Sequence, residues 1–260
     1  MIRLNGLYRL LNHEFSRWLR FIALLCAAAI IVPLLLLHSA SSDSGELTAH
    51  PRYEDLYAAS GCPILFLLLL TLLCAYFLIT IYRGYWSGKS IYTYLTLPVR
   101  RESLYFSKLF VFIACLLLLL AAQLISIHLG YAIFEHQARS VYEGKLVMHN
   151  GLFLAFVRSD FFRLLLPFSF SRALSSFSIL AVIAAGFYYG ALCERCRRYE
   201  GFAAIAAAGY LLYRAVAYRL NEVNHYTSPT GLYASSLLML ALSGLFVWHS
   251  LWLIRRGAVA

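Results

Sequence analysis

Long apolar runs alternate with polar, often basic segments along the whole chain. Each run is close to the ~20 residues that a helix needs to cross the ~30 Å hydrocarbon core of a bilayer. Because lipid offers the backbone no hydrogen-bond partners, apolar runs of this length predict helices. The six predicted spans are Phe21–Ser39, Cys62–Ile81, Leu109–Phe134, Leu174–Leu192, Gly201–Leu220 and Leu232–Ile254. The sequence therefore predicts an all-α integral membrane protein with six transmembrane helices in a single domain, residues 1–260.

The segment before the first span, residues 1–20, has apolar residues at helical spacing over four turns. Arg3, Arg9, His13 and Arg17 lie on its other faces. This pattern is typical of an amphipathic helix lying in the membrane interface, where arginine and tryptophan suit the headgroup level. A flanking tail of positive charge is the alternative. The apolar positions are Leu4, Leu7, Tyr8, Leu11, Phe15 and Trp18.

The connection after the third span, residues 135–173, is long and only partly polar. It holds two apolar runs, 152–157 and 161–166, that are too short to cross a bilayer. The polar residues 158–160 separate the two runs, and Pro167 ends the second. Such runs lie in the interface or enter the membrane part way. We expect one or two short helices on the outer face.

Composition and charge agree with the apolar pattern and give it an orientation. Hydrophobic residues make up 62% of the chain and charged residues 13%, whereas about a quarter of a soluble protein is charged. With the N-terminus inside, the inner segments hold 14 Lys and Arg against four acids, and the outer segments hold seven against eight. Basic loops stay in the cytoplasm, so both termini are predicted to be cytoplasmic. No cleavable signal peptide is apparent, and we expect a multi-pass protein of a bacterial plasma membrane.

The polar segment between the second and third spans, residues 82–108, is predicted to be a cytoplasmic elbow. Pro98 disfavours the α region for Leu97 and suits the first turn of a new helix. One helix is therefore predicted to end near Leu95 and another to begin at Pro98. The basic residues of the segment are Arg83, Lys89, Arg100, Arg101 and Lys108. Charges placed directly before an apolar run must stay in water or meet a partner, so the elbow offers charge to a cytoplasmic partner.

Part of this elbow looks like the end of a phosphate-binding loop. Ser87-Gly88-Lys89-Ser90 has the right ending, but the first glycine of that motif would fall on Arg83, and Gly84 comes one residue too late. The motif also follows a buried strand, whereas an apolar run suited to a membrane span comes before this segment. We therefore do not expect the elbow to bind a nucleotide.

The fifth span carries an arginine and three tyrosines on one helical face: Tyr210, Tyr213, Arg214 and Tyr218. An arginine at the bilayer centre costs about 2.5–3.5 kcal/mol on insertion scales. Arg214 lies only about 9 Å from the predicted outer end, which is within snorkelling distance. The face is therefore either an anchoring belt at the outer interface, which we favour, or part of a transport pathway.

Small and polar residues within other spans predict contacts between helices. Gln123, Ser126 and Gly130 form a polar stripe on the third span, for which hydrogen bonding to a neighbouring helix is the favoured role. The other candidate contact residues are Gly186, Gly190, Gly201, Ala204, Ala208, Ser236, Ser243 and Gly244.

No catalytic or metal-binding motif stands out in the chain. Cys193 and Cys196 are spaced as C-x-x-C, but a zinc site needs two further ligands that the predicted cytoplasmic segments do not supply. A charged inner turn is the favoured interpretation. The histidines lack the spacing of known ligand pairs. An intramembrane enzyme would need a catalytic pair that we do not find.

The elbow resembles one family. Gly88-Lys89-Ser90, then Leu95-Thr96-Leu97-Pro98-Val99-Arg100-Arg101-Glu102, then Ser107-Lys108 is similar to the "G-K … L-x-L-P-x-x-R … K" segment of the membrane subunits of type-2 ABC exporters. The six spans and the amphipathic N-terminal helix fit the same family. One departure is that family members often place re-entrant outer elements between the last two spans, whereas here the large outer segment follows the third.

The resemblance implies a permease that forms half of a translocation pathway together with a second, identical or paralogous permease. The N-terminal helix and the elbow would seat on a separate cytoplasmic ATPase subunit, which would bind ATP and Mg²⁺. The chain itself would bind no cofactor, would not be an enzyme and would have no nucleic-acid partner. The implied contact positions are Gly88, Lys89, Leu97, Pro98, Arg100, Arg101, Glu102 and Lys108. The alternative is a non-transporting polytopic membrane protein, such as an immunity or sensor partner.

Overall fold

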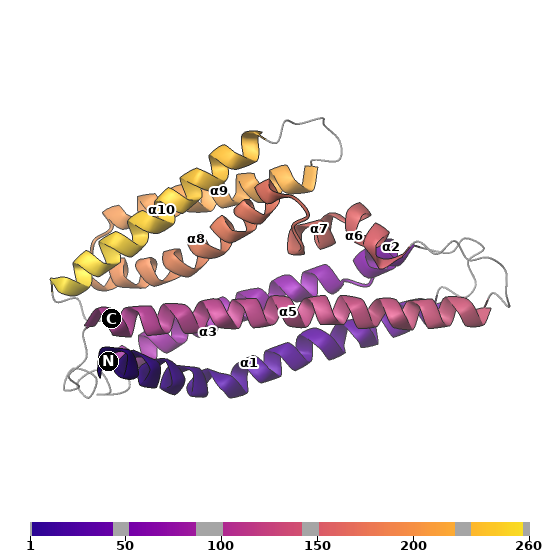
Figure 1. Cartoon of the computed structure of the whole chain (residues 1–260), viewed down its shortest axis with the longest axis horizontal. Coiled ribbons are helices and arrows are strands. Elements are labelled where there is room, and N and C mark those ends of the chain that lie inside the picture. Colours follow the sequence, from indigo (N-terminus) through magenta and orange to yellow (C-terminus); the bar gives the residue numbers. More distant parts are fainter. Residues whose placement is uncertain (1, 44–51, 87–100, 142–150, 222–229, 257–260) are drawn as a thin grey trace. The chain divides into compact units, whose positions relative to one another are not determined.

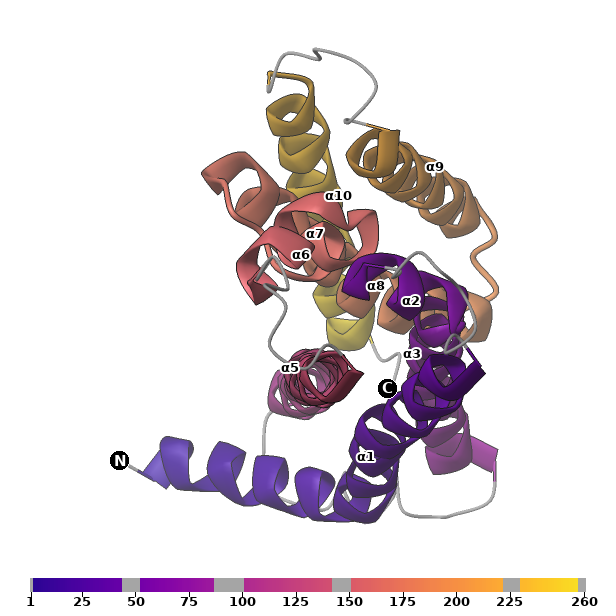
Figure 2. The same cartoon turned by 90° about the vertical axis from the view of Figure 1, so that its right-hand side faces the viewer.

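The computed structural model describes residues 2–43, 52–86, 101–141, 151–221 and 230–256 of the 260-residue chain. These residues form helices and short connections, and the described part of the chain contains no strand. The helices, in chain order, are α1 (Ile2–Asp43), α2 (Tyr53–Ala59), α3 (Cys62–Trp86), α5 (Arg101–Val141), α6 (Leu152–Arg158), α7 (Asp160–Leu165), α8 (Phe170–Arg195), α9 (Glu200–Asn221) and α10 (Thr230–Arg255). Figures 1 and 2 show them from two directions.

Among the described residues, six helices are long and apolar enough to cross a membrane. Their apolar segments are Tyr8–Ala40, Cys62–Arg83, Glu102–His136, Phe170–Arg195, Glu200–Leu220 and Leu232–Arg255. All six spans predicted from the sequence lie within these segments. The prediction of an all-α integral membrane protein is confirmed.

The N-terminal region differs from the prediction in one respect. Residues 1–20 were expected to form a helix of their own, but α1 runs without a break from Ile2 to Asp43. The side of the helix that packs inside the protein carries Leu10, Glu14 and Trp18. Within the predicted apolar stripe, Trp18 is buried, Leu11 and Phe15 are half-buried and Tyr8 is 70% exposed. The interfacial position of this segment stays a prediction.

The long connection after the third span forms helices, as expected. Helices α6 and α7 occupy the two short apolar runs, and Ser159 separates them. The Ser159 hydroxyl accepts a hydrogen bond of 3.4 Å from the backbone N–H of Phe162, the usual contact of an N-cap residue. The short helix α2 was not predicted. It begins at Tyr53 with Glu54 and Asp55 in its first turn, where acids favour a helix N-terminus.

The described chain divides into two compact units. The first comprises residues 1–19, 73–115 and 167–260, and the second comprises residues 20–72 and 116–166. Helices α1, α3 and α5 contribute residues to both.

Helices α8, α9 and α10 pack against one another in the first unit (Figure 1). The ring of Tyr189 on α8 stacks on Phe246 of α10 with 4.8 Å between centroids, and its hydroxyl lies 2.8 Å from Nδ1 of His249. Gly201, at the start of α9, lies so close to α8 that a Cβ atom there would be 2.8 Å from the Tyr189 hydroxyl oxygen. Gly201, Ala208, Ser236 and Ser243 are buried, as predicted contacts should be. The prediction is wrong for Gly244, which is exposed and has open space around it.

The second unit is held by an aromatic cluster, comprising Tyr53, Tyr57, Phe156, Phe161 and Phe162, that joins α2, α6 and α7. Contact between α2 and α6 and between α6 and α7 is visible in Figure 2. Phe162 is fully buried.

The polar stripe predicted on the third span anchors this aromatic cluster to α5. Gln123 donates a hydrogen bond to the hydroxyl of Tyr57, and the Tyr53 hydroxyl donates to the backbone carbonyl of Ile127 over 2.8 Å. Ser126 donates to the carbonyl of Ile30 on α1 over 3.5 Å. The predicted role in hydrogen bonding between helices is confirmed. Burial raises the pKa of both tyrosine hydroxyls, so both remain neutral.

Candidate functional site

Most residues of the predicted elbow lie outside the described part of the chain. These are Gly88, Lys89, Leu97, Pro98 and Arg100, together with the helix boundaries expected at Leu95 and Pro98. Arg101 begins α5, but its side chain is not described. The structure therefore defines what flanks this segment: the last turns of α3 on one side and the first turns of α5, with Glu102 and Lys108, on the other.

The start of α5 is joined to the end of α10 by an ion pair. Arg255 Nε lies 2.8 Å from Glu102 Oε1, and the side chains are 68% and 32% exposed. Each charge suits its helix end, because an acid in the first turn and a base in the last turn complement the helix dipole. An exposed pair of this kind contributes only about 0–1 kcal/mol to stability. It therefore positions the two helix ends while leaving them free to separate.

The end of α3 is joined to the end of α8 by a second polar contact. The hydroxyl of Tyr82 donates a hydrogen bond to Glu194 Oε2. Glu194 is exposed, and an ionised carboxylate only accepts hydrogen bonds, so it can hold the phenol and still bind another donor. Both helices that flank residues 87–100 are therefore fastened to the C-terminal helices of the same unit.

A third contact involves a buried acid on α1. Glu14 is 6% exposed, lies 3.9 Å from Nη1 of Arg17 and interacts electrostatically with Lys108 of α5. Lys108 is also close enough to feel the charges of Arg17 and Arg195. A buried carboxylate needs a partner of opposite charge, so the pairing explains why an acid faces inward on this helix.

Aromatic packing completes this attachment of α1. The indole of Trp18 packs edge-on to Tyr76 with 4.9 Å between centroids and tilts against Phe77 at 6.0 Å. Phe77 stacks in turn on Phe112 of α5 at 4.0 Å. The segment of α1 from Glu14 to Trp18 is thus held against α3 and α5 by both charge and aromatic contact. We call the residues Glu14, Tyr82, Glu102, Lys108, Glu194 and Arg255 the charged end.

Sequence reasoning identified only part of the charged end. Glu102 and Lys108 were predicted site residues, whereas Glu14, Tyr82, Glu194 and Arg255 were not. One signal was available for Glu14, because it lies four residues from both Leu10 and Trp18 and therefore shares their helical face. No local pattern pairs Tyr82 with Glu194, or Glu102 with Arg255, since the partners are 112 and 153 residues apart.

The predicted face of α9 points away from its own unit. Tyr210 and Tyr213 are 63% and 71% exposed, Arg214 is also exposed, and Tyr218 is half-buried. The next arginine behaves differently: Arg219 is 6% exposed, and its Nη1 donates to Ser176 Oγ of α8 over 2.9 Å. The buried arginine of α9 is thus Arg219. The choice between an anchoring belt and a pathway for Arg214 stays a prediction.

The C-x-x-C residues lie at a sharp turn. Cys193 is buried, Cys196 caps the C-terminus of α8, and Arg197 follows with a φ of 51° in the left-handed region. Arg198 and Arg256 both lie over the indole of Trp252, with the guanidinium carbons 5.2 Å and 3.7 Å from the ring centroid. Within the described ranges, no three metal-ligating side chains come together. The two cysteines therefore lie at a turn rich in arginine at the end of α8.

Comparison with protein families connects this architecture to a known class. Residues 10–191 match the model described as "ABC-2 family transporter protein". The chain belongs to the ABC-2 family. No curated protein and no solved structure matches it.

The match confirms the resemblance drawn from the elbow and identifies the chain as a membrane component of an ABC transporter. It covers α1 from residue 10, the elbow with both of its flanking helices, and most of α8. Of the charged end, Glu194 and Arg255 lie beyond the matched residues, so the structure alone connects them to the elbow. Family membership favours a transporter subunit over the immunity or sensor alternative.

Proposed function

We propose that this ABC-2 subunit is one half of an ATP-driven exporter and is moved by a separate cytoplasmic ATPase that binds the elbow. The observation that carries the proposal is that both helices flanking residues 87–100 are fastened to other helices of the same unit. Tyr82 joins α3 to α8 through Glu194, and Glu102 joins α5 to α10 through Arg255. A displacement of the elbow would therefore reach α8 and α10 as well as α3 and α5.

The division of labour within the elbow follows from these contacts. Glu102 and Lys108 have partners inside the permease, so we assign them to anchoring. Contact with the ATPase then falls on the residues before them, with Arg100 and Arg101 as the principal charges and Gly88, Lys89, Leu97 and Pro98 shaping the segment. ATP and Mg²⁺ belong to the partner subunit in this proposal, since the elbow lacks the first glycine of a phosphate-binding loop.

The excess of basic residues in the predicted inner segments, 14 Lys and Arg against four acids, supports their assignment to the cytoplasm of a bacterial cell. Cysteines introduced at Ser44 and Ser140 should react with an impermeant thiol reagent from outside, and one at Arg197 only from inside. Labelling of the Arg197 position from the exterior alone would reverse the orientation and remove the elbow from the reach of an ATPase.

A second permease, identical or paralogous, is expected to complete the pathway. The exposed face of α9 supports this part of the proposal, because an arginine and two tyrosines within a membrane span are costly to leave against lipid. Cover by a second subunit, or by a shared aqueous pathway, would remove that cost.

The direct test replaces both elbow arginines with glutamate, as Arg100→Glu with Arg101→Glu. The permease is co-expressed with a candidate ABC ATPase subunit, and association and ATP hydrolysis are measured on the purified complex. We expect the variant to insert normally but to lose the ATPase or its stimulation, because like charges across an interface are repelled. The matched control is Arg197→Glu with Arg198→Glu, an equal change in net charge at another basic turn. Normal association and hydrolysis in the elbow variant would refute the proposed coupling.

A further inference from the structure

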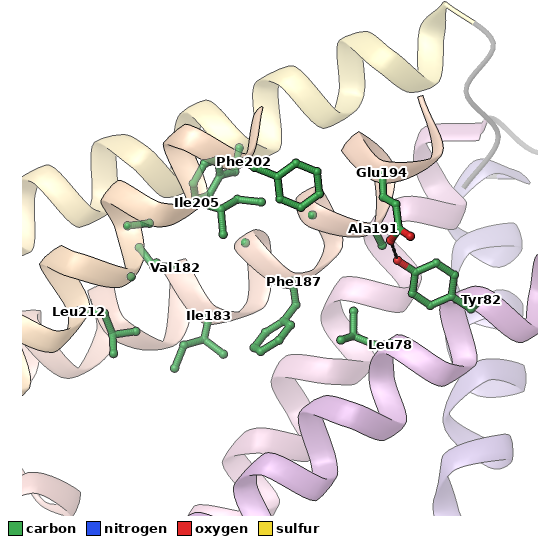
Figure 3. Close-up of a pocket in the computed structure, with 15 residues that line it drawn as sticks. Leu78, Tyr82, Val182, Ile183, Phe187, Ala191, Glu194, Phe202, Ile205 and Leu212 are labelled. Carbon is green, nitrogen blue, oxygen red and sulfur yellow. Dashed lines mark hydrogen bonds between the residues drawn. The ribbon is translucent and has the colours of Figure 1, made fainter. Parts of the chain in front are cut away.

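A groove opens between α8, α9 and the end of α3, all within the first unit (Figure 3). It is a cavity of about 340 Å³ whose lining is mostly aliphatic and aromatic. One end lies at Val182 and Leu212, and the other lies where Tyr82 meets Glu194. The groove is thus an apolar slot with a single carboxylate at one end.

Three glycines create the groove. Gly186 and Gly190 on α8 and Gly209 on α9 line it where other residues would project a side chain. Gly209 has nothing within 4 Å of the position of a Cβ atom, and at Gly186 only the ring of Phe246 comes within that distance, at 3.8 Å. A glycine in a helix interior costs about 1 kcal/mol relative to alanine. At Gly209 no neighbouring helix is close enough to require a glycine. A molecule bound in the groove would explain why a residue that weakens the helix stands there.

The length of the groove corresponds to one leaflet of a bilayer. From Val182 to Glu194 the groove follows α8 for twelve residues, or about 18 Å at the helical rise. Half of a hydrocarbon core is about 15 Å. The apolar part therefore runs from the level of Glu194, at the helix end, to about the middle of the membrane.

The volume indicates what kind of molecule can occupy the groove. A helix is about 10 Å wide and could only lie over the opening of this groove, whereas a single extended hydrocarbon chain is narrow enough to lie within it. Such a chain would contact the apolar walls along its length, and the sum of these small contacts is substantial.

The polar end selects the headgroup. Glu194 retains free acceptor sites beside the Tyr82 hydroxyl. A carboxylate repels an anionic headgroup and attracts an ammonium group that can donate hydrogen bonds. The polar end of the groove therefore favours a lipid whose headgroup carries an ammonium group.

We propose that this groove binds one acyl chain of an aminophospholipid, phosphatidylethanolamine, whose ammonium group binds Glu194. The inference goes beyond the proposed coupling and does not depend on the ATPase. Only the leaflet depends on the proposed orientation, which makes it the cytoplasmic one. A lipid at this position would cover the crevice between α8 and α9 directly beside the contact that fastens α3.

The test uses the full-length subunit, purified in detergent and titrated with phosphatidylethanolamine or phosphatidylglycerol under native mass spectrometry. The variant Gly209→Leu projects a side chain into the groove from a position where a Cβ atom has nothing within 4 Å, and it replaces a poor helix former. We expect it to retain phosphatidylethanolamine about tenfold less well than the unmodified chain, because the leucine takes the contacts of the lipid chain. The matched control is Gly244→Leu, also at an exposed helical glycine with open space but outside the groove.

A second variant tests the headgroup. Glu194→Gln keeps an acceptor for Tyr82 but removes the negative charge, so the preference for phosphatidylethanolamine over phosphatidylglycerol should disappear. Equal retention by Gly209→Leu and Gly244→Leu would overturn the groove as the site. An unchanged lipid preference in Glu194→Gln would overturn the headgroup assignment. A change in the number of permease copies in Gly209→Leu would overturn the lipid in favour of a protein contact.

Discussion

The contacts within one unit of this ABC-2 subunit differ in kind from the contacts within the other. The aromatic cluster of the second unit is buried, and its tyrosines are tied by neutral hydrogen bonds to α5. The charged end of the first unit relies on polar contacts, two of them near the surface. Dense packing resists rearrangement, because losing it opens a cavity. Exposed charge contacts are weak and can re-form elsewhere. The comparison teaches that the second unit resists rearrangement, whereas the contacts of the charged end can change at little cost, as the proposed coupling requires.

The largest effect on stability is expected from Phe162→Ala in the aromatic cluster. Phe162 is fully buried among Tyr53, Tyr57, Phe156 and Phe161, and deleting a buried phenylalanine costs about 3–5 kcal/mol. Thermal unfolding in detergent should show a clear fall in midpoint. Phe153→Ala, on α6 and 66% exposed, is the control and should unfold near the original temperature. Similar midpoints for both variants would mean that the cluster is not a rigid core.

A smaller effect is expected from Gly130→Ala, which tests how closely the same unit is packed. A Cβ atom at Gly130 would lie 2.7 Å from Leu37 Cδ1 and 2.8 Å from the hydroxyl oxygen of Tyr53. That hydroxyl is fixed by its hydrogen bond to Ile127, so the overpacking should cost about 1–3 kcal/mol. Gly244→Ala, with open space around it, should be neutral or slightly stabilising. If Gly130→Ala matches this control in thermal unfolding, the close approach of α1, α2 and α5 is wrong.

The smallest effect on stability is expected at the charged end. Arg255→Ala removes an exposed partner of Glu102, so the free energy of unfolding should change by no more than about 1 kcal/mol. The measurement is again thermal unfolding, compared with Arg256→Ala, which changes the adjacent exposed arginine that lies over the ring of Trp252. A loss comparable to that of Phe162→Ala would make the ion pair a structural core element and remove the contrast between the units.

The sequence predicted the membrane spans well because their length is fixed by the bilayer. The second span begins at Cys62 in both the prediction and the structure. The fourth begins four residues earlier than predicted, at Phe170, because Ser169 caps it by accepting a hydrogen bond from Arg172 N–H. Helix α2 escaped prediction because its seven residues mix acids and aromatics without a span-length apolar run.

The functional contacts were much less predictable. The elbow could be recognised from a local motif, but the partners of its flanking residues depend on how distant helices pack. Glu194 appeared only as part of a charged turn, and nothing near it in the sequence indicates Tyr82. The continuous α1 was missed for a related reason, since the sequence signals a change of environment near residue 20 without any residue that breaks the helix.

A charge-swap experiment tests most directly whether the charged end transmits movement. Glu102→Arg and Arg255→Glu each place like charges together, whereas the double variant restores an opposite pair in the reverse order. Each variant is assembled with the ATPase partner in nanodiscs, and ATP hydrolysis is compared with that of the ATPase alone. The account predicts normal association in all three, loss of stimulation in both single variants and its recovery in the double variant. Full stimulation in the single variants, or none in the double variant, would contradict it.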